Sequence, residues 1–219
     1  MPDPLQTTTL LLGTAATLAG LHALLGIDHS LPFVALGRAR GWTLGRTLLV
    51  TGVCGGGHVA SSVVIGAAGV GLGIAADALL WLESARGELA AALLIGFGLA
   101  YAAWAVWRRL RGRDGVHLHG DSAAVGRVTP WALFIVLTLG PCEPLIPLML
   151  VPGVARDWVV LGAVIGVFGM VTVAVMLAAV AAGWRGVDLL GGHRTARYAD
   201  VAAGLVVAAS GAAVLVLGL

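Results

Sequence analysis

The chain carries little charge and no lysine. Of its 219 residues, 11% are charged, and every basic residue is an arginine. Soluble domains carry about 25% charged residues, so these few could not cover a water-facing surface of this size. Hydrophobic residues make up 59% of the chain, and glycine alone contributes 33 residues. Small residues allow close helix packing in lipid, so the composition predicts an all-α integral membrane protein.

Long hydrophobic runs are abundant. A membrane-spanning helix needs about 20 apolar residues, and six segments meet that length. Tryptophans fall near the ends of most of these segments, where headgroups favour amphipathic rings. The predicted spans cover residues 8–27, 44–72, 89–107, 131–151, 159–183 and 201–219, and the tryptophans are Trp42, Trp81, Trp107, Trp131, Trp158 and Trp184.

Arginine is unevenly distributed over the predicted loops. Eleven of the 13 Arg fall in or beside the first, third and fifth loops, and only Arg86 and Arg156 fall in the second and fourth. Cytoplasmic loops are enriched in Arg and Lys, so both termini are expected outside. The first ten residues lack a basic n-region, so no cleaved signal peptide is expected. The lysine-free, arginine-rich composition is typical of a GC-rich bacterial genome, which indicates the bacterial inner membrane.

The chain divides into two halves of three spans. The halves are residues 1–107 and 129–219, joined by an Arg- and His-containing cytoplasmic loop at 108–128. An offset of 114 places Asp28-His29 over Cys142-Glu143, each pair beside glycine and proline. Three spans separate the two sites, so the halves would be inverted relative to each other. Two inverted three-helix repeats with a site at their interface are a recurrent transporter architecture.

Few ionisable residues lie within the predicted spans. Such residues are costly in lipid and mark ion pathways, substrate sites or proton relays. The candidates, with two cysteines beside them, are His22, Asp28, His29, His58, Glu143, Cys54 and Cys142.

The spacing of these residues predicts shared sites. His22 and His29 are seven residues apart, which is two helical turns. Cys54 and His58 are four apart and can face one site. The prolines that flank Cys142-Glu143 prevent a regular helix there, and such a break exposes carbonyls that can hold a cation.

Each candidate also has a structural interpretation. Asp28-His29 could be an internal ion pair that braces a helix end. A buried histidine commonly bonds a carbonyl, and the cysteines could be small packing residues. The loop pair His117 and His119 could relay metal or be solvated loop.

Carboxylate, imidazole and thiolate together suit a first-row divalent transition metal as the transported substrate. The chain has no lysine, so it cannot contain the nucleotide-binding Gly-x-x-x-x-Gly-Lys motif. We therefore expect a secondary transporter and not an enzyme, with no permanently bound cofactor and no nucleic-acid partner. Lipid surrounds it, and small-residue runs such as 66–69 leave a homo-oligomer open.

The segment Leu21-His22-Ala23-Leu24-Leu25-Gly26-Ile27-Asp28-His29 resembles the first-helix motif of bacterial nickel/cobalt transporters. Those belong to the lysine-exporter-like superfamily of six-helix, inverted-repeat membrane proteins, beside sulfite-exporter and urease-accessory-like members. The resemblance implies that His22, Asp28 and His29 lie on a metal pathway. The gap from His22 to Asp28-His29 is one residue longer than in the family motif, and the exporters' His-rich loop is reduced to two histidines.

A second resemblance concerns Pro141-Cys142-Glu143-Pro144-Leu145-Ile146-Pro147. This segment is similar to the Cys-Pro segments of thiol-disulfide electron conduits in cytochrome c biogenesis. It implies an alternative function in which Cys54 and Cys142 form a redox pair, although the repeat places Asp28, not a cysteine, opposite Cys142. A weaker alternative is an anion or small-solute exporter, which should show a buried arginine, and apart from Arg46 at the start of 44–72 none lies inside a predicted span.

Overall fold

All regular structure in the described residues is helical. The computed structural model describes residues 4–111, 119–189 and 198–217. In chain order the elements are α1 (Pro4–Leu25), the short 3-10 helix η1 (Ile27–His29), α2 (Leu31–Ala39), α3 (Leu44–Leu72), α4 (Ala76–Leu110), α5 (His119–Leu139), α6 (Leu145–Val154), α7 (Trp158–Leu189) and α8 (Ala199–Leu217).

Five of the described helices, α1, α3, α4, α7 and α8, are long and apolar enough to cross a membrane. The predicted span at 131–151 is not one helix, because α5 ends at Leu139 and α6 begins at Leu145. Neither the apolar part of α5 nor α6 reaches a membrane-spanning length alone. The chain is therefore an all-α, multi-pass membrane protein.

Two helix breaks occur where the sequence predicts them. The first follows α1: Gly26 ends the helix, η1 makes one tight turn, and Pro32 lies in the first turn of α2. The second lies between α5 and α6 and contains Pro141 and Pro144. Proline has no N–H to donate and its ring clashes with the preceding turn, so a regular helix cannot continue through 140–144.

The prediction for the third span is wrong at its start. Residues 73–88 were expected to form a loop, but α4 begins at Ala76 and runs for 35 residues. The connection is a tight turn in which Gly73 adopts φ 65°, a left-handed conformation that favours glycine. Charged residues in this stretch do not end the helix, because Glu83 and Arg86 pair across one turn. At its other end α4 reaches Leu110, and residues 112–118 of the predicted 108–128 loop lie outside the described part.

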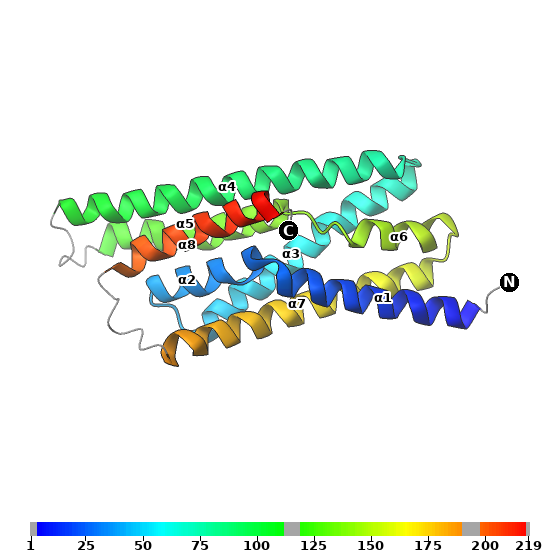
Figure 1. Ribbon diagram of the computed structural model, residues 1–219, viewed down its shortest axis with the longest axis horizontal. Coiled ribbons are helices and arrows are strands. Elements are labelled where there is room, and N and C mark those ends of the chain that lie inside the picture. The colour runs from blue at the N-terminus through cyan, green and yellow to red at the C-terminus, as the bar shows by residue number, and fades with distance from the viewer. Residues whose placement is uncertain (1–3, 112–118, 190–197, 218–219) are drawn as a thin grey trace.

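The helices form an elongated bundle, and α1 and α2 together follow one direction along it (Figure 1). α3 returns and α4 runs forward again, whereas α5 and α6 run opposite to α1 and α2 (Figure 1). α1 packs on α7, α3 packs on both α5 and α7, and α4 packs along α8. Both breaks therefore lie inside the bundle, part-way along its length.

The α4–α8 contact brings backbone against backbone. A Cβ on Gly98 would lie 2.4 Å from the backbone nitrogen of Ala208, and one on Gly204 would lie 2.6 Å from that of Ala102. Only glycine fits at these two positions. Helices in lipid associate through this kind of close van der Waals packing, because no hydrophobic effect drives them together.

Arginines gather at one end of the bundle, where α2, α4 and α7 end and α3 begins (Figure 1). Two ion pairs join neighbouring helices there: Arg38 with Asp188 at 2.7 Å and Arg108 with Asp200 at 3.0 Å. Arg38 also stacks on the ring of Trp184 at 3.9 Å. These contacts join α2 to α7 and α4 to α8 at the arginine-rich end of the bundle.

Candidate metal site

Three histidines converge in the middle of the bundle. His22 lies in the last turn of α1, His29 ends η1 and His58 lies on α3. One ring nitrogen from each lies within 4.8 Å of the others, which is a spacing that could hold a metal ion. His29 and His58 are buried, with 3% and 1% of their surface exposed, and His22 is partly buried.

The helix break at Gly26 is what brings His22 and His29 together. In a continuous helix, seven residues would separate their backbones by about 10 Å along the axis. The turn of η1 instead places the ring centroids 4.8 Å apart, edge to face. A Cβ on Gly26 would lie 2.2 Å from His29 Nδ1, so glycine is required for this approach.

Hydrogen bonds assign the tautomers of two of the rings. His29 Nδ1 lies 3.0 Å from Asp28 Oδ1 and 3.2 Å from the Gly26 carbonyl oxygen, and His58 Nδ1 lies 2.9 Å from the Leu137 carbonyl oxygen. All three partners are acceptors, so both Nδ1 atoms carry the proton. In the neutral rings both Nε2 atoms therefore present lone pairs, and these face each other at 3.3 Å. A cation between them would turn that repulsion into coordination.

The nitrogen spacing matches that of metal ligands. Histidine nitrogens 2.0–2.1 Å from a tetrahedral metal lie about 3.3–3.4 Å apart. The His58 Nε2 atom lies 3.3 Å from His29 Nε2 and 3.4 Å from His22 Nε2. Two edges of the donor triangle thus already have the length that tetrahedral coordination needs.

The thiol of Cys142 lies beside one of the three histidines. Its Sγ lies 3.8 Å from His22 Nε2, and its surface is 0% exposed. With a zinc-like metal, a thiolate and a histidine nitrogen lie about 3.6 Å apart. Three imidazoles with a cysteine sulfur beside them are borderline-soft groups, which suit late first-row metals and not calcium or magnesium.

Asp28 supports a ligand and does not join the cluster. Its carboxylate accepts from His29 Nδ1 and retains 21% side-chain exposure. A carboxylate behind a metal-binding histidine orients the ring and raises its basicity. The predicted pairing of Asp28 with His29 is thus present, and it orients His29 Nε2 towards His58.

Glu143 and Cys54 lie apart from the three histidines. Glu143 is exposed, although it lines the same cavity as His22 and His29. Cys54 is buried in an apolar cluster that includes Met176, whereas Cys142 belongs to a different cluster. Both cysteines are free. The side chains of His117 and His119 lie outside the described residues.

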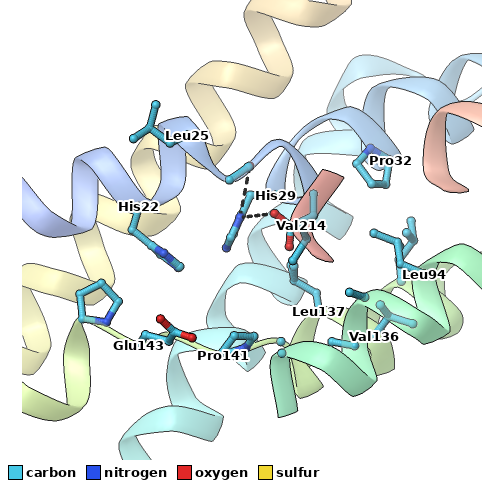
Figure 2. A pocket seen from close by; sticks show the side chains of 18 of the residues that line it. His22, Leu25, His29, Pro32, Leu94, Val136, Leu137, Pro141, Glu143 and Val214 are labelled. Atoms are coloured by element: carbon cyan, nitrogen blue, oxygen red, sulfur yellow. Dashed lines mark hydrogen bonds and ion pairs between the residues drawn. The ribbon is translucent and has the colours of Figure 1, made fainter. Parts of the chain in front are cut away.

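A cavity of about 270 Å³ borders the histidines and opens between α1, α4, α5 and α8. Figure 2 shows His22 and His29 projecting towards each other, with Glu143 and Pro141 on the opposite wall. The dashed lines in Figure 2 are the bonds from His29 to Asp28 and to Gly26. The remaining lining is mostly apolar and includes Leu94, Leu137 and Val214.

Two charged residues beside the site, Glu83 and Arg86, are not among the candidates from the sequence. Arg86 was placed in a loop, but it lies in α4, and its side chain is only 12% exposed. Its ion-pair partner Glu83 is 0% exposed. The statement that no arginine other than Arg46 lies within a span is therefore wrong. The spacing of Glu83 and Arg86, three residues apart after the apolar run 78–82, could have revealed a paired helical face.

Three carbonyls at the second break accept hydrogen bonds from side chains. Arg86 donates to the carbonyl oxygens of Thr138 and Gly140 at 3.0 and 3.4 Å, and His58 donates to that of Leu137. That carbonyls of this break hold a cation stays a prediction.

Comparison of the chain with protein-family models, with curated proteins and with solved structures finds no match. The fold and the site together define a class: a multi-pass, all-helical membrane protein with a buried histidine cluster that could hold a metal ion.

Proposed function

We propose that the protein is a secondary transporter that moves a divalent transition-metal cation, nickel- or cobalt-like, across the bacterial cytoplasmic membrane. His22, His29, His58 and Cys142 are its ligands. One observation carries the proposal: two Nε2 lone pairs, whose tautomers are set by acceptors on the far side of each ring, face each other at 3.3 Å. A bridging metal cation satisfies both, as a proton shared between the two rings also does.

Charge balance also favours a divalent ion. A buried net charge is expensive in lipid. A dication bound to neutral imidazoles, with the Cys142 thiolate as ligand and the Asp28 carboxylate behind His29, gives a site with no net charge. Because the thiol must lose its proton when metal binds, binding releases a proton, which provides a means of coupling transport to a proton gradient.

The position of His58 along α3 supports a substrate site near the middle of the membrane. His58 is the midpoint of α3, 14 residues from Leu44 and 14 from Leu72. That distance corresponds to about 21 Å of helix on each side. Substrate and coupling-ion sites of secondary transporters lie near the bilayer midplane, at the interface of the two repeats.

The two halves support an inverted repeat. Each half runs as a broken helix, then a long helix, then a third helix. A Cβ on Gly55 would lie 3.4 Å from Val173, and one on Gly169 would lie 3.3 Å from Val59. Both pairs relate by the offset of 114 that also relates Gly26 to Gly140. Rocking of one half against the other about this contact would give alternating access to the metal site.

The cavity provides one access route to the histidines. Glu143 on its wall would attract a cation before it reaches His22 and His29. The arginine-rich end of the bundle indicates the cytoplasmic side, which places both termini outside if there are six passes.

Metal binding by the purified protein tests the proposal directly. Calorimetry with Ni²⁺, Co²⁺, Zn²⁺, Mn²⁺ and Fe²⁺ should show one site per chain that prefers the later metals. The H29A/H58A double variant should bind none, and the protein in sealed vesicles should move the preferred metal. Wild-type protein that binds none of these metals would contradict the proposal.

The thiol-disulfide alternative is distinguished by cysteine chemistry. A conduit requires Cys54 and Cys142 to cycle between thiol and disulfide, and the C54S/C142S variant would then be inactive. A metal transporter with those substitutions keeps three ligands and loses affinity without losing binding. The anion alternative gains no support from Arg86, because its guanidinium is bonded to Glu83, to Ser61 and to two carbonyls.

A further inference from the structure

A buried ion pair lies next to the metal site but touches none of its ligand atoms. Glu83 and Arg86 are one turn apart on α4, and their side chains are 0% and 12% exposed. Charged side chains inside a membrane protein are rare and usually have a functional role. The hydrogen-bond partners of this pair indicate that role.

Glu83 bonds two elements of the site. Its Oε2 accepts from the backbone N–H of Cys142 at 3.0 Å and from the Ser62 hydroxyl at 3.2 Å. Ser62 follows His58 by one turn on α3. A single carboxylate oxygen therefore connects the backbone of one metal ligand to the helix that carries another.

Arg86 bonds the opposite side of the same break. Its guanidinium donates to the Thr138 and Gly140 carbonyls, at the end of α5, and to the Ser61 hydroxyl at 2.8 Å. These carbonyls have no further helical turn to bond, and polar backbone left unsatisfied in lipid is costly. Close packing completes the contact, because a Cβ on Gly87 would lie 2.9 Å from Pro141.

The segment between these bonds controls two donors. The Leu137 carbonyl fixes the proton of His58 on Nδ1, and the backbone of Cys142 determines where its Sγ meets His22. Movement of residues 137–142 would therefore turn His58 and withdraw the thiol together.

We propose that Glu83 and Arg86 are the positioning pair of the metal site: they fix residues 137–142 so that Cys142 Sγ faces His22 and the Leu137 carbonyl orients His58. This inference rests on the proposed function for its metal readout. It predicts that α4, which contributes no ligand, determines whether the thiolate coordinates.

Cobalt spectroscopy of the full-length protein in detergent tests the pair, because a thiolate bound to Co²⁺ adds a near-ultraviolet charge-transfer band. E83Q replaces the carboxylate, whose two oxygens accept from Arg86 and from the Cys142 N–H, by an amide with a single oxygen, so one of these two bonds is lost. It should weaken Co²⁺ binding about tenfold, as loss of an outer partner does, and should weaken the thiolate band at saturating Co²⁺. E83D, which keeps the charge, should restore part of the band. E88Q, at an exposed position on the same helix, is the matched control and should leave both unchanged.

A second measurement needs no metal. In a C54S background, Cys142 is the only thiol, and its labelling by a membrane-permeant maleimide reports the position of the break. E83Q should speed labelling about tenfold, whereas E88Q should not. If E83Q changes labelling but the wild type binds no Co²⁺, the positioning role stands and the metal function fails. If folded E83Q labels like the wild type and keeps the full thiolate band, the proposal is wrong.

Discussion

The two helix breaks, at 26–30 and at 140–144, have the same origin and different chemistry. Both begin at a glycine, contain or precede a proline, and lie inside the bundle. The first break carries the imidazole of His29, a proposed metal ligand, with Asp28 behind it. The second carries a thiol, Cys142, and its carbonyls are bonded by Arg86 and His58.

This difference shows how two similar helix breaks can supply two kinds of group. In the first break the hydrogen bonds are local, since His29 bonds Asp28 and Gly26 within the same turn. In the second break the hydrogen bonds come from side chains of other helices, α3 and α4. Changes in the first break should therefore act on a ligand directly, whereas changes in the second should act through its supports.

The largest effect is expected at His58, which contacts both other imidazoles. H58A should lower metal affinity by more than roughly a hundredfold, beyond the usual loss of an outer partner. The offset of 114 places Thr172 of α7 where α3 has His58, and Thr172 is also fully buried. T172V should leave affinity unchanged, and calorimetry on both variants makes the comparison. Equal losses would show that the two halves share the site more evenly than the contacts indicate.

A paired glycine test should distinguish the breaks. In G26A the new Cβ would meet His29 Nδ1 at 2.2 Å, so the ring must move and affinity should fall by roughly 10- to 100-fold. In G140A the nearest atoms are the Leu137 oxygen at 3.1 Å and His58 Nδ1 at 3.6 Å, so the effect should be under about threefold. Melting curves control for lost folding. The reverse order of effects would contradict the assignment of His29 as a ligand.

Proton release should identify the thiolate. Metal binding displaces the proton of Cys142, so calorimetry in buffers of different ionisation heat should show about one proton fewer released by C142S than by the wild type. The affinity of the wild-type protein for the metal should also fall as the pH is lowered, because the imidazoles and the thiol must be deprotonated to bind the metal. An unchanged proton count in C142S would remove the cysteine from the donor set, and C54S is the control.

The smallest effect on affinity is expected at Glu143. It is exposed and lines the cavity, so E143Q should change equilibrium binding by less than about threefold while slowing uptake into vesicles at low metal concentration. D28N, in the other break, should instead lower affinity about tenfold, because it loosens His29. If E143Q lowers metal affinity as much as D28N does, Glu143 is a metal ligand in another conformation of the protein.

The fold class and the two helix breaks could be predicted from the sequence. The scarcity of charge and the long apolar runs predicted an all-helical membrane protein, and the glycine and proline positions predicted both breaks. The reason is physical: burial in lipid and the missing proline N–H act locally, through properties that each residue carries with it. His22, His29 and His58 were identified because imidazoles in apolar spans are conspicuous.

Only the tertiary structure decided which candidates meet. Cys54 is one helical turn from His58 in the sequence, yet it packs in the apolar core. Cys142, in contrast, lies beside His22 although 120 residues separate them in the chain. The start of α4 and its buried pair, Glu83 and Arg86, could not be predicted from the sequence. Charged residues next to an apolar run are normally assigned to a loop, and only the folded structure shows that these two are buried as a pair. Composition and local sterics determine where helices form and break, but the packing of distant helices determines which polar groups face one another.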